Sequence, residues 1–271
     1  MASMFGSDAY APAEISERIE TMGVAKARLP LLAMAVLGVL AGAFIGLGAL
    51  SSVLVLSDAS LGFAVSRVLA GLVFSLGLLL VVVAGAELFT GNNLLAMAWA
   101  DGRIGTGELL RNWTVVCAAN AVGAVGLAGM VYLSGHASAN GGAIAQTYLS
   151  IGEAKCAMPL WEAFWRAILC NVLVCLAVWM AAAGRSVTDK AVAIVPPVTA
   201  FVAAGFEHSI ANLYLVPMAL LLEAGGAGAA PALDGDAFLR QLVVVIAGNL
   251  VGGSVLVALV YHLIYRRGQP S

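Results

Sequence analysis

Ala84-Gly-Ala-Glu-Leu-Phe-Thr-Gly-Asn-Asn-Leu94 lies in the middle of an apolar run from Val68 to Ala100, in which Glu87 is the single charged residue. As one straight helix, this run of 33 residues would measure roughly 50 Å, against a hydrocarbon core of about 30 Å. Two glycines, a carboxylate and two amides interrupt its centre. The stretch therefore predicts a helix that breaks within the membrane, where unwound backbone is tolerated only if it is buried in protein or lines a cavity.

A second stretch, Ala204-Gly-Phe-Glu-His-Ser-Ile-Ala-Asn-Leu213, has the same pattern. Both read Ala-Gly-x-Glu with an Asn five residues after the Glu, which pairs Glu87 with Asn92 and Glu207 with Asn212. The apolar runs that follow the breaks also match, as Asn120-Ala-Val-Gly123 and Asn249-Leu-Val-Gly252. We infer an internal duplication. Because each half has three spans, the second copy enters the membrane with opposite polarity.

The composition indicates a membrane protein, because the chain is 62% apolar and 10% charged, whereas soluble domains are typically about 45–50% apolar and about 25% charged. Six spans are predicted, namely Leu29–Ser57, Val68–Ala100, Asn112–Ser134, Ala167–Gly184, Ala191–Leu222 and Leu242–Tyr265. The predicted fold class is all-α, with six transmembrane helices as two inverted three-helix repeats and with broken helices 2 and 5. The 13 Lys and Arg and the 15 Asp and Glu are spread along the chain, so nucleic acid is not an expected partner.

The chain is predicted to form a single transmembrane domain over residues 1–271. Residues 29–267 make the six-helix bundle, and the polar link from Gly135 to Leu160 separates its halves. Residues 1–28 are predicted to hold a cytoplasmic N-terminal amphipathic helix, with one face made of Ile15, Ile19 and Met22 and the opposite face of Glu17, Arg18 and Glu20. We expect the apolar face to lie at the membrane interface or, alternatively, to pack against a neighbouring subunit.

Basic residues predict the orientation, because cytoplasmic loops carry the excess of Lys and Arg. Nine of the 13 fall on one side of the predicted membrane, namely Arg18, Lys26, Arg28, Arg103, Arg111, Arg185, Lys190, Arg266 and Arg267. The other four are Arg67, Lys155, Arg166 and Arg240. We therefore expect both termini in the cytoplasm.

The paired breaks predict a channel or transporter. Half-helix N-termini near the midplane offer partial positive charge and free N–H groups, which favour an anion or a polar neutral solute. The competing class is a membrane-embedded enzyme or sensor that uses Glu87, Glu207 and His208 chemically. That class lacks support, because the sequence has no zinc-protease, nucleophile-elbow or nucleotide-binding loop motif. We expect no catalytic residue, no metal and no cofactor, and we interpret the four Cys as buried small hydrophobes.

Several stretches resemble the formate/nitrite transporter family of prokaryotes and some protists, over essentially the whole chain. They are Ala84 to Asn93, Lys155 through Asn171 to Trp179, Phe206 to Asn212, and Gly248-Asn-Leu-Val-Gly-Gly253. The resemblance implies an aquaporin-like fold in a prokaryotic inner membrane, assembled in the lipid bilayer as a homopentamer with one pore per protomer. It implies small monovalent anions as substrates, with formate first and nitrite or hydrosulfide second. Aquaporins share the architecture, but their paired Asn-Pro-Ala signature is absent, so water or glycerol conduction is the weaker reading.

The same resemblance assigns residues to the pore. The central histidine of the family falls on His208, and the threonine of its loop in the broken second helix falls on Thr90. Hydrophobic constrictions on either side would comprise Phe74 and Phe201, with Leu78 and Leu88. The residues that favour anions near the central histidine fall on Lys155 and Asn171.

The two glutamates at the breaks are expected to be structural rather than part of the transport chemistry. Glu87 and Glu207 would bond the backbone N–H groups that the breaks expose, and Asn92 and Asn212 would support them there.

Two routes for formate remain open from the sequence. If formate titrates near 4, like an Asp side chain, its protonation at pH 7 costs on the order of 4 kcal/mol. This is comparable to the desolvation cost of moving the charged carboxylate past the Phe and Leu side chains of the constrictions. In one route His208, whose reference pKa is about 6.5, supplies a proton and the solute leaves as formic acid. In the other, His208 stays a neutral donor, while Lys155 and the half-helix dipoles attract an anion that crosses charged.

Overall fold

The computed structural model of the chain describes residues 9–265, so residues 1–8 of the predicted N-terminal segment, as well as Arg266 and Arg267, lie outside the described residues. The six predicted spans are confirmed by six apolar segments long enough to cross a membrane. These are α2 (Leu31–Leu56), α3 (Phe63–Leu79) with the π-helical continuation Leu80–Gly85, α5 (Thr106–Leu133), α7 (Leu160–Ala183), α8 (Val187–Ala204), and α10 (Gly235–Leu250) continued by Val251–Leu259 and α11 (Val260–Tyr265). The protein is a multi-pass α-helical membrane protein.

The second and fifth spans are both broken where the sequence predicts. The first broken span unwinds after Gly85, which has a φ of +87°, and restarts as a 3-10 turn (Gly91–Leu94) followed by α4 (Leu95–Ala100). The other unwinds after α8 at Gly205, which has a φ of +73°, and restarts as α9 (Ser209–Ala224). Glycine suits both points because an L side chain is strained at a positive φ. Each span therefore consists of two half-helices joined by extended backbone.

Each repeat also begins with a short helix, α1 (Pro12–Ala27) in the first and α6 (Ala143–Ala157) in the second. The predicted polar link between the halves is thus largely helical. Several of its apolar residues, Tyr148 and Leu149 among them, are buried, and α6 packs against α9 as α1 packs against α4. Helix α6 is consequently the counterpart of α1 rather than a loop.

The prediction for the faces of α1 is partly wrong. Ile15 and Ile19 are buried, but Met22 is 40% exposed. Glu20, expected on the polar face, is fully buried, and its carboxylate lies 3.5 Å from the guanidinium of Arg103. The reason is that α1 packs against α4, α5, α7 and α11 of its own chain, so it has protein on more than one side.

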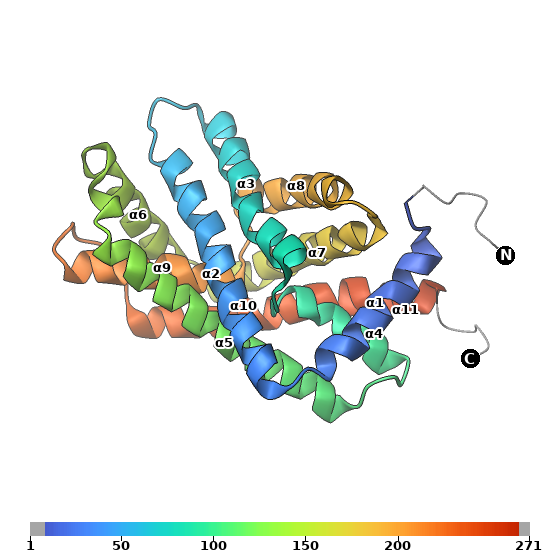
Figure 1. Cartoon of the computed structure of the whole chain (residues 1–271). Coiled ribbons are helices and arrows are strands. Elements are labelled where there is room, and N and C mark those ends of the chain that lie inside the picture. The colour runs from blue at the N-terminus through green and yellow to red at the C-terminus, as the bar shows by residue number, and fades with distance from the viewer. Residues whose placement is uncertain (1–8, 266–271) are drawn as a thin grey trace.

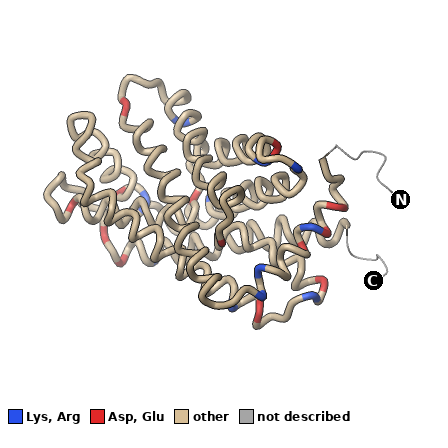
Figure 2. Tube along the Cα trace, in the orientation of Figure 1, with Lys and Arg blue, Asp and Glu red and all other residues tan. Residues whose placement is uncertain are grey.

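The two repeats interlock rather than lie side by side. Helix α3 packs along α8, while α9 packs against both α2 and α5. The first and last described helices, α1 and α11, contact each other and lie at the same end of the molecule (Figure 1). Most charged residues lie at helix ends and in loops (Figure 2), as expected for helices whose long apolar faces meet lipid.

Helices α2 and α5 approach each other closely through glycine. A Cβ atom added to Gly42 would overlap the backbone carbonyl of Asn120, and one added to Gly123 would overlap the carbonyl of Val39. Small residues at a crossing allow backbones to approach in this way, and van der Waals packing then replaces the hydrophobic drive that lipid cannot supply. This contact also brings Asn120 of α5 next to the first break.

We predict that Gly123→Ala lowers the thermal stability of the purified protein, because the added methyl group has to push α5 away from α2. Overpacking of this kind typically costs about 1–3 kcal/mol. The matched control is Gly126→Ala in the same helix, where an added Cβ has no neighbour within 4 Å. Thermal unfolding in detergent, followed by size-exclusion chromatography, measures both. Equal midpoints for the two variants would contradict the packing argument.

Candidate functional site

The carboxylate of Glu87, at the first break, is held by an ammonium group and an amide. Lys26 of α1 donates to Oε1 at 2.6 Å, and the side-chain amide of Asn92 donates to Oε2 at 2.7 Å. Asn92 also donates to Oδ1 of Asn112 at 3.0 Å. Glu87 is buried and Lys26 is partly buried, so this ion pair is largely withdrawn from water.

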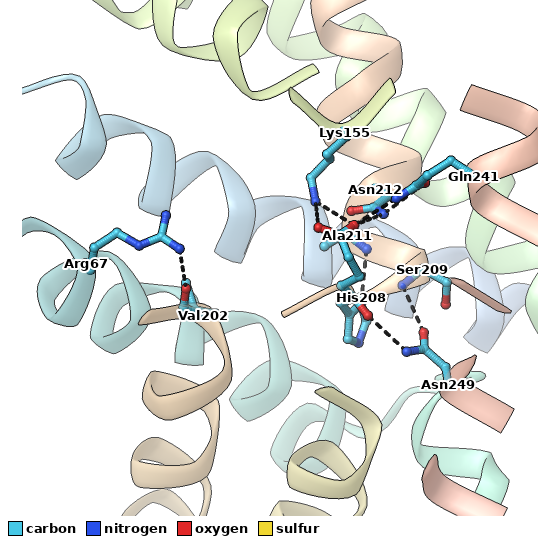
Figure 3. A network of polar contacts seen from close by, with 10 residues as sticks. Arg67, Lys155, Val202, His208, Ser209, Ala211, Asn212, Gln241 and Asn249 are labelled. Atoms are coloured by element: carbon cyan, nitrogen blue, oxygen red, sulfur yellow. Dashed lines mark hydrogen bonds and ion pairs between the residues drawn. The ribbon is translucent and has the colours of Figure 1, made fainter. Parts of the chain in front are cut away.

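The second break repeats this arrangement around Glu207. Lys155 of α6 donates to both carboxylate oxygens at 2.9 Å. Asn212 and Gln241 donate to Oε2 at 2.7 and 3.0 Å. Figure 3 shows Lys155, Asn212 and Gln241 converging from three different helices.

The glutamates therefore bond side chains, and the expectation that they bond exposed backbone N–H groups is wrong. The physical reason is charge, because a carboxylate gains more from an ammonium group than from a peptide N–H. Lys155, expected to favour anions, lines the same cavity as His208, but the carboxylate of Glu207 neutralises its charge.

Asn120 of α5 satisfies the backbone of the first break. Its Oδ1 accepts the N–H of Phe89 at 2.9 Å. Its amide donates to the carbonyls of Glu87 and Gly38 at 2.8 and 2.7 Å. One fully buried side chain thus bonds two peptide groups of the unwound segment and ties them to α2.

Asn249 of α10 does the same for the second break. Its Oδ1 accepts the N–H of Ser209 at 3.0 Å, and its amide donates to the carbonyls of Glu207 and Ala167 at 3.0 and 2.8 Å. Only an amide side chain offers both an acceptor and two donors in this space. The Asn-x-Val-Gly pattern noted in the sequence therefore marks the residue that holds each break.

Thr90 and His208 meet between the two breaks, with 3.1 Å between Oγ1 and Nε2. Each immediately precedes a second half-helix, Thr90 before the turn that leads into α4 and His208 before α9. Nδ1 of His208 accepts the backbone N–H of Ala211 at 3.1 Å and so caps α9. Since that nitrogen is an acceptor, the hydrogen-bond pattern assigns the proton of the neutral ring to Nε2, facing Thr90.

Asn171 of α7 lies close to this pair, and its amide nitrogen is directed at protein acceptors. Its amide nitrogen lies within donating distance of Oδ1 of Asn93 (2.7 Å) and of the carbonyls of Asn249 (2.7 Å) and Thr90 (3.3 Å). An amide has two hydrogens, so these three acceptors engage both of them. Asn171 holds the loop that carries Thr90, and its N–H groups are engaged by protein rather than free for an anion.

Two cavities approach the Thr90–His208 pair. One, of about 230 Å³, is lined by residues that include Phe74, Phe201, His208, Lys155 and Glu207, and we call it the Glu207 cavity. The rings of Phe74 and Phe201 meet edge to face with centroids 5.7 Å apart, and Phe201 stacks on His208 at 5.9 Å.

The other, of about 440 Å³, is lined by residues that include Leu78, Leu88, Lys26 and Glu87, and we call it the Glu87 cavity. The four residues assigned to constrictions thus divide into an aromatic pair at one cavity and a leucine pair at the other.

Comparison with known proteins identifies the family. The sequence profile described as "Formate/nitrite transporter" matches residues 13–263. The chain belongs to the formate/nitrite transporter family. It is 37% identical to the formate channel FocA of Escherichia coli strain K12, over 96% of both chains.

Two solved structures of this family are also similar. One, a pentameric formate channel with formate bound, gives a TM-score of 0.79 at 36% identity and covers 87% of this chain and 97% of its own. The other, an ion channel of the formate/nitrite transporter family, gives a TM-score of 0.83 at 29% identity, over 93% and 98% of the two chains. The chain is therefore a membrane channel or transporter and not an enzyme, as the sequence predicts.

Sequence reasoning missed Lys26, Asn112 and Gln241 as members of this formate/nitrite transporter site. Two further short stretches that recur in both halves of the chain could have identified these residues. Gly23-Val-Ala-Lys26 matches Gly152-Glu-Ala-Lys155, and Leu110-Arg-Asn112 matches Leu239-Arg-Gln241. These short matches gain meaning only once α1 and α6 are recognised as equivalent helices.

Proposed function

We propose that this chain conducts small monovalent anions, with formate as the main substrate, across a prokaryotic inner membrane. The observation that carries the proposal is the Thr90–His208 pair, buried at the starts of two half-helices between two cavities. Helix N-termini carry partial positive charge, and α9 with 16 residues directs such an end at the pair. Nitrite and hydrosulfide are second candidates, because the site offers general hydrogen bonding rather than contacts particular to one anion.

We propose that the neutral ring of His208 donates its Nε2–H to the solute. The hydroxyl of Thr90 orients the imidazole ring and the solute. A second proton on the ring would have to occupy Nδ1, which accepts the N–H of Ala211. It would break the cap of α9 and place a cation at a positive helix end. This geometry favours His208 as a neutral donor, so we propose that the proton accompanying formate comes from water in the cavities.

Orientation and assembly complete the proposal. With both termini in the cytoplasm, the Glu87 cavity beneath α1 opens to the cytoplasm and the Glu207 cavity opens to the outside. The relative described as a pentameric formate channel supports a homopentamer for this chain, with one pore in each protomer.

Purified protein in liposomes tests the function directly. We predict that formate enters faster than in protein-free liposomes, and faster at pH 6 than at pH 7, because the share of formic acid rises about tenfold for each unit of pH at such values. Nitrite, hydrosulfide and glycerol uptake in the same vesicles gives the substrate order. Glycerol uptake without formate uptake would contradict the proposal and favour an aquaporin-like role.

A pair of variants tests the two central residues. We predict that His208→Asn retains formate uptake and its acceleration at low pH, because Asn keeps an acceptor for the N–H of Ala211 and a donor toward the pore. Thr90→Val should weaken formate binding about tenfold, since it removes the hydroxyl that bonds Nε2, while Thr90→Ser should not. Formate uptake and lumen pH are recorded together. Loss of proton uptake in correctly assembled His208→Asn would show that the ring itself supplies the proton.

The aromatic pair of the Glu207 cavity tests selectivity. We predict that the double change Phe74→Ala and Phe201→Ala admits acetate and lactate, because narrow apolar rings exclude larger and hydrated solutes by shape and dewetting. The leucine pair is tested in the same way with Leu78→Ala. Unchanged acetate and lactate permeability in a stable double variant would mean that Phe74 and Phe201 only fill the core.

Native mass spectrometry tests assembly. We predict a pentamer of the 27.6 kDa chain in detergent. Exposed apolar side chains on several spans, such as Leu133 and Phe63, provide surface for both lipid and neighbouring subunits. A monomer or a tetramer at every detergent concentration would contradict the homopentamer.

A further inference from the structure

The charges that line the Glu207 cavity do not all act on a solute. Its charged lining residues are Arg67, Lys155, Arg166 and Glu207. Lys155 is neutralised by Glu207 at 2.9 Å, and Arg166 pairs with Glu162 at 3.1 Å. Among residues 9–265, Arg67 forms no ion pair with a carboxylate at salt-bridge distance. The uncompensated positive charge of this cavity is therefore that of Arg67.

Arg67 is fixed in place by the end of the broken helix. From the first turns of α3 its Nε donates to the carbonyl of Ala203 at 3.1 Å, and its Nη2 donates to that of Val202 at 3.2 Å. Figure 3 shows the guanidinium reaching across to Val202. A Cβ added to Gly205 would lie 2.7 Å from Nη2, so glycine leaves the space that the guanidinium occupies.

The position matters because α8 ends there. A helix C-terminus carries about half a negative charge on its unbonded carbonyls, which would repel an anion beside the aromatic pair of Phe74 and Phe201. Arg67 bonds the carbonyl of Ala203 and shares that of Val202 with the N–H of Gly205, and it adds a full positive charge at this end. The end of α8 thereby changes from a repulsive to an attractive surface.

Resting on the proposed function, we propose that Arg67 captures the anion at the Glu207 cavity and sets the apparent affinity from that side. Arg67 acts while the anion enters the cavity, before the anion reaches the buried Thr90–His208 pair. Clefts lined by one sign of charge raise the local concentration of an oppositely charged solute, and salt screens this effect.

The other cavity has a corresponding cation. Lys190, near the start of α8, lines the Glu87 cavity together with Arg18 of α1 and with Val82 and Gly85, where the first half of the broken span ends. Lys26 in that cavity is neutralised by Glu87, as Lys155 is by Glu207. The antiparallel pairing of α3 with α8 thus places a cation from each helix beside the broken end of the other.

The test measures initial formate uptake in proteoliposomes against formate concentration, at low and at high concentration of an impermeant salt. Arg67→Gln removes the charge but keeps a donor for one carbonyl of α8. We expect the half-saturating concentration to rise about threefold to tenfold, with the maximum rate within about twofold of wild type and with weaker salt dependence. Arg67→Lys should stay close to wild type. The matched control is Arg240→Gln, which removes one exposed charge outside both cavities.

Three outcomes would overturn the proposal. The first is an unchanged half-saturating concentration and maximum rate in Arg67→Gln. The second is an equal rise of the half-saturating concentration in Arg67→Gln and Arg67→Lys, with unchanged salt dependence. The third is wild-type uptake at low formate that does not respond to salt. The last needs no variant, so it decides even if Arg67→Gln fails to assemble. The series repeated with nitrite tests capture on a second anion, so a failure of formate as substrate is distinguished from a failure of Arg67.

Discussion

Backbone that leaves the helical conformation inside a membrane has to be hydrogen-bonded by protein, because lipid offers no partner. In this chain Asn120 and Asn249 meet that requirement, each bonding both an N–H and a carbonyl of one break. The close approach of α2 to α5 at Gly42 and Gly123 belongs to the same arrangement, since it brings Asn120 to the unwound segment. Each amide thus stabilises the unwound segment that leads into a second half-helix, together with main-chain carbonyls that accept the N–H groups of Glu87 and Glu207.

The buried ion pairs are the second consequence of the breaks. An isolated carboxylate at Glu87 or Glu207 would be strongly destabilising, and each receives one lysine from the short helix that begins its own repeat. Helices α1 and α6 are thus equivalent elements, and each packs against the bundle and supplies the lysine that balances one glutamate. Among the cationic side chains that line the two cavities, Lys26 and Lys155 are thereby the ones that balance glutamates.

The contact between Thr90 and His208 follows from the positions of the second half-helices. Because Thr90 and His208 each precede one, the hydroxyl and the imidazole meet where the N-terminal ends of the two half-helices converge. His208 has two tasks, capping α9 through Nδ1 and presenting Nε2 to Thr90. Asn171, by contrast, contacts Thr90 through the backbone carbonyl of Thr90.

The sequence by itself determined the membrane class, the six spans, the two breaks and the inverted repeat, because all of these follow from hydropathy, helix length and repeated residues along one chain. It also indicated His208 and Thr90, through resemblance. It did not determine which side chains balance Glu87 and Glu207, that Glu20 is buried, or that Arg67 lies at the end of α8. Those facts join residues far apart in the chain, and periodicity describes only the face of one helix. Only the packing of the interlocked repeats decided which lysine pairs with which glutamate.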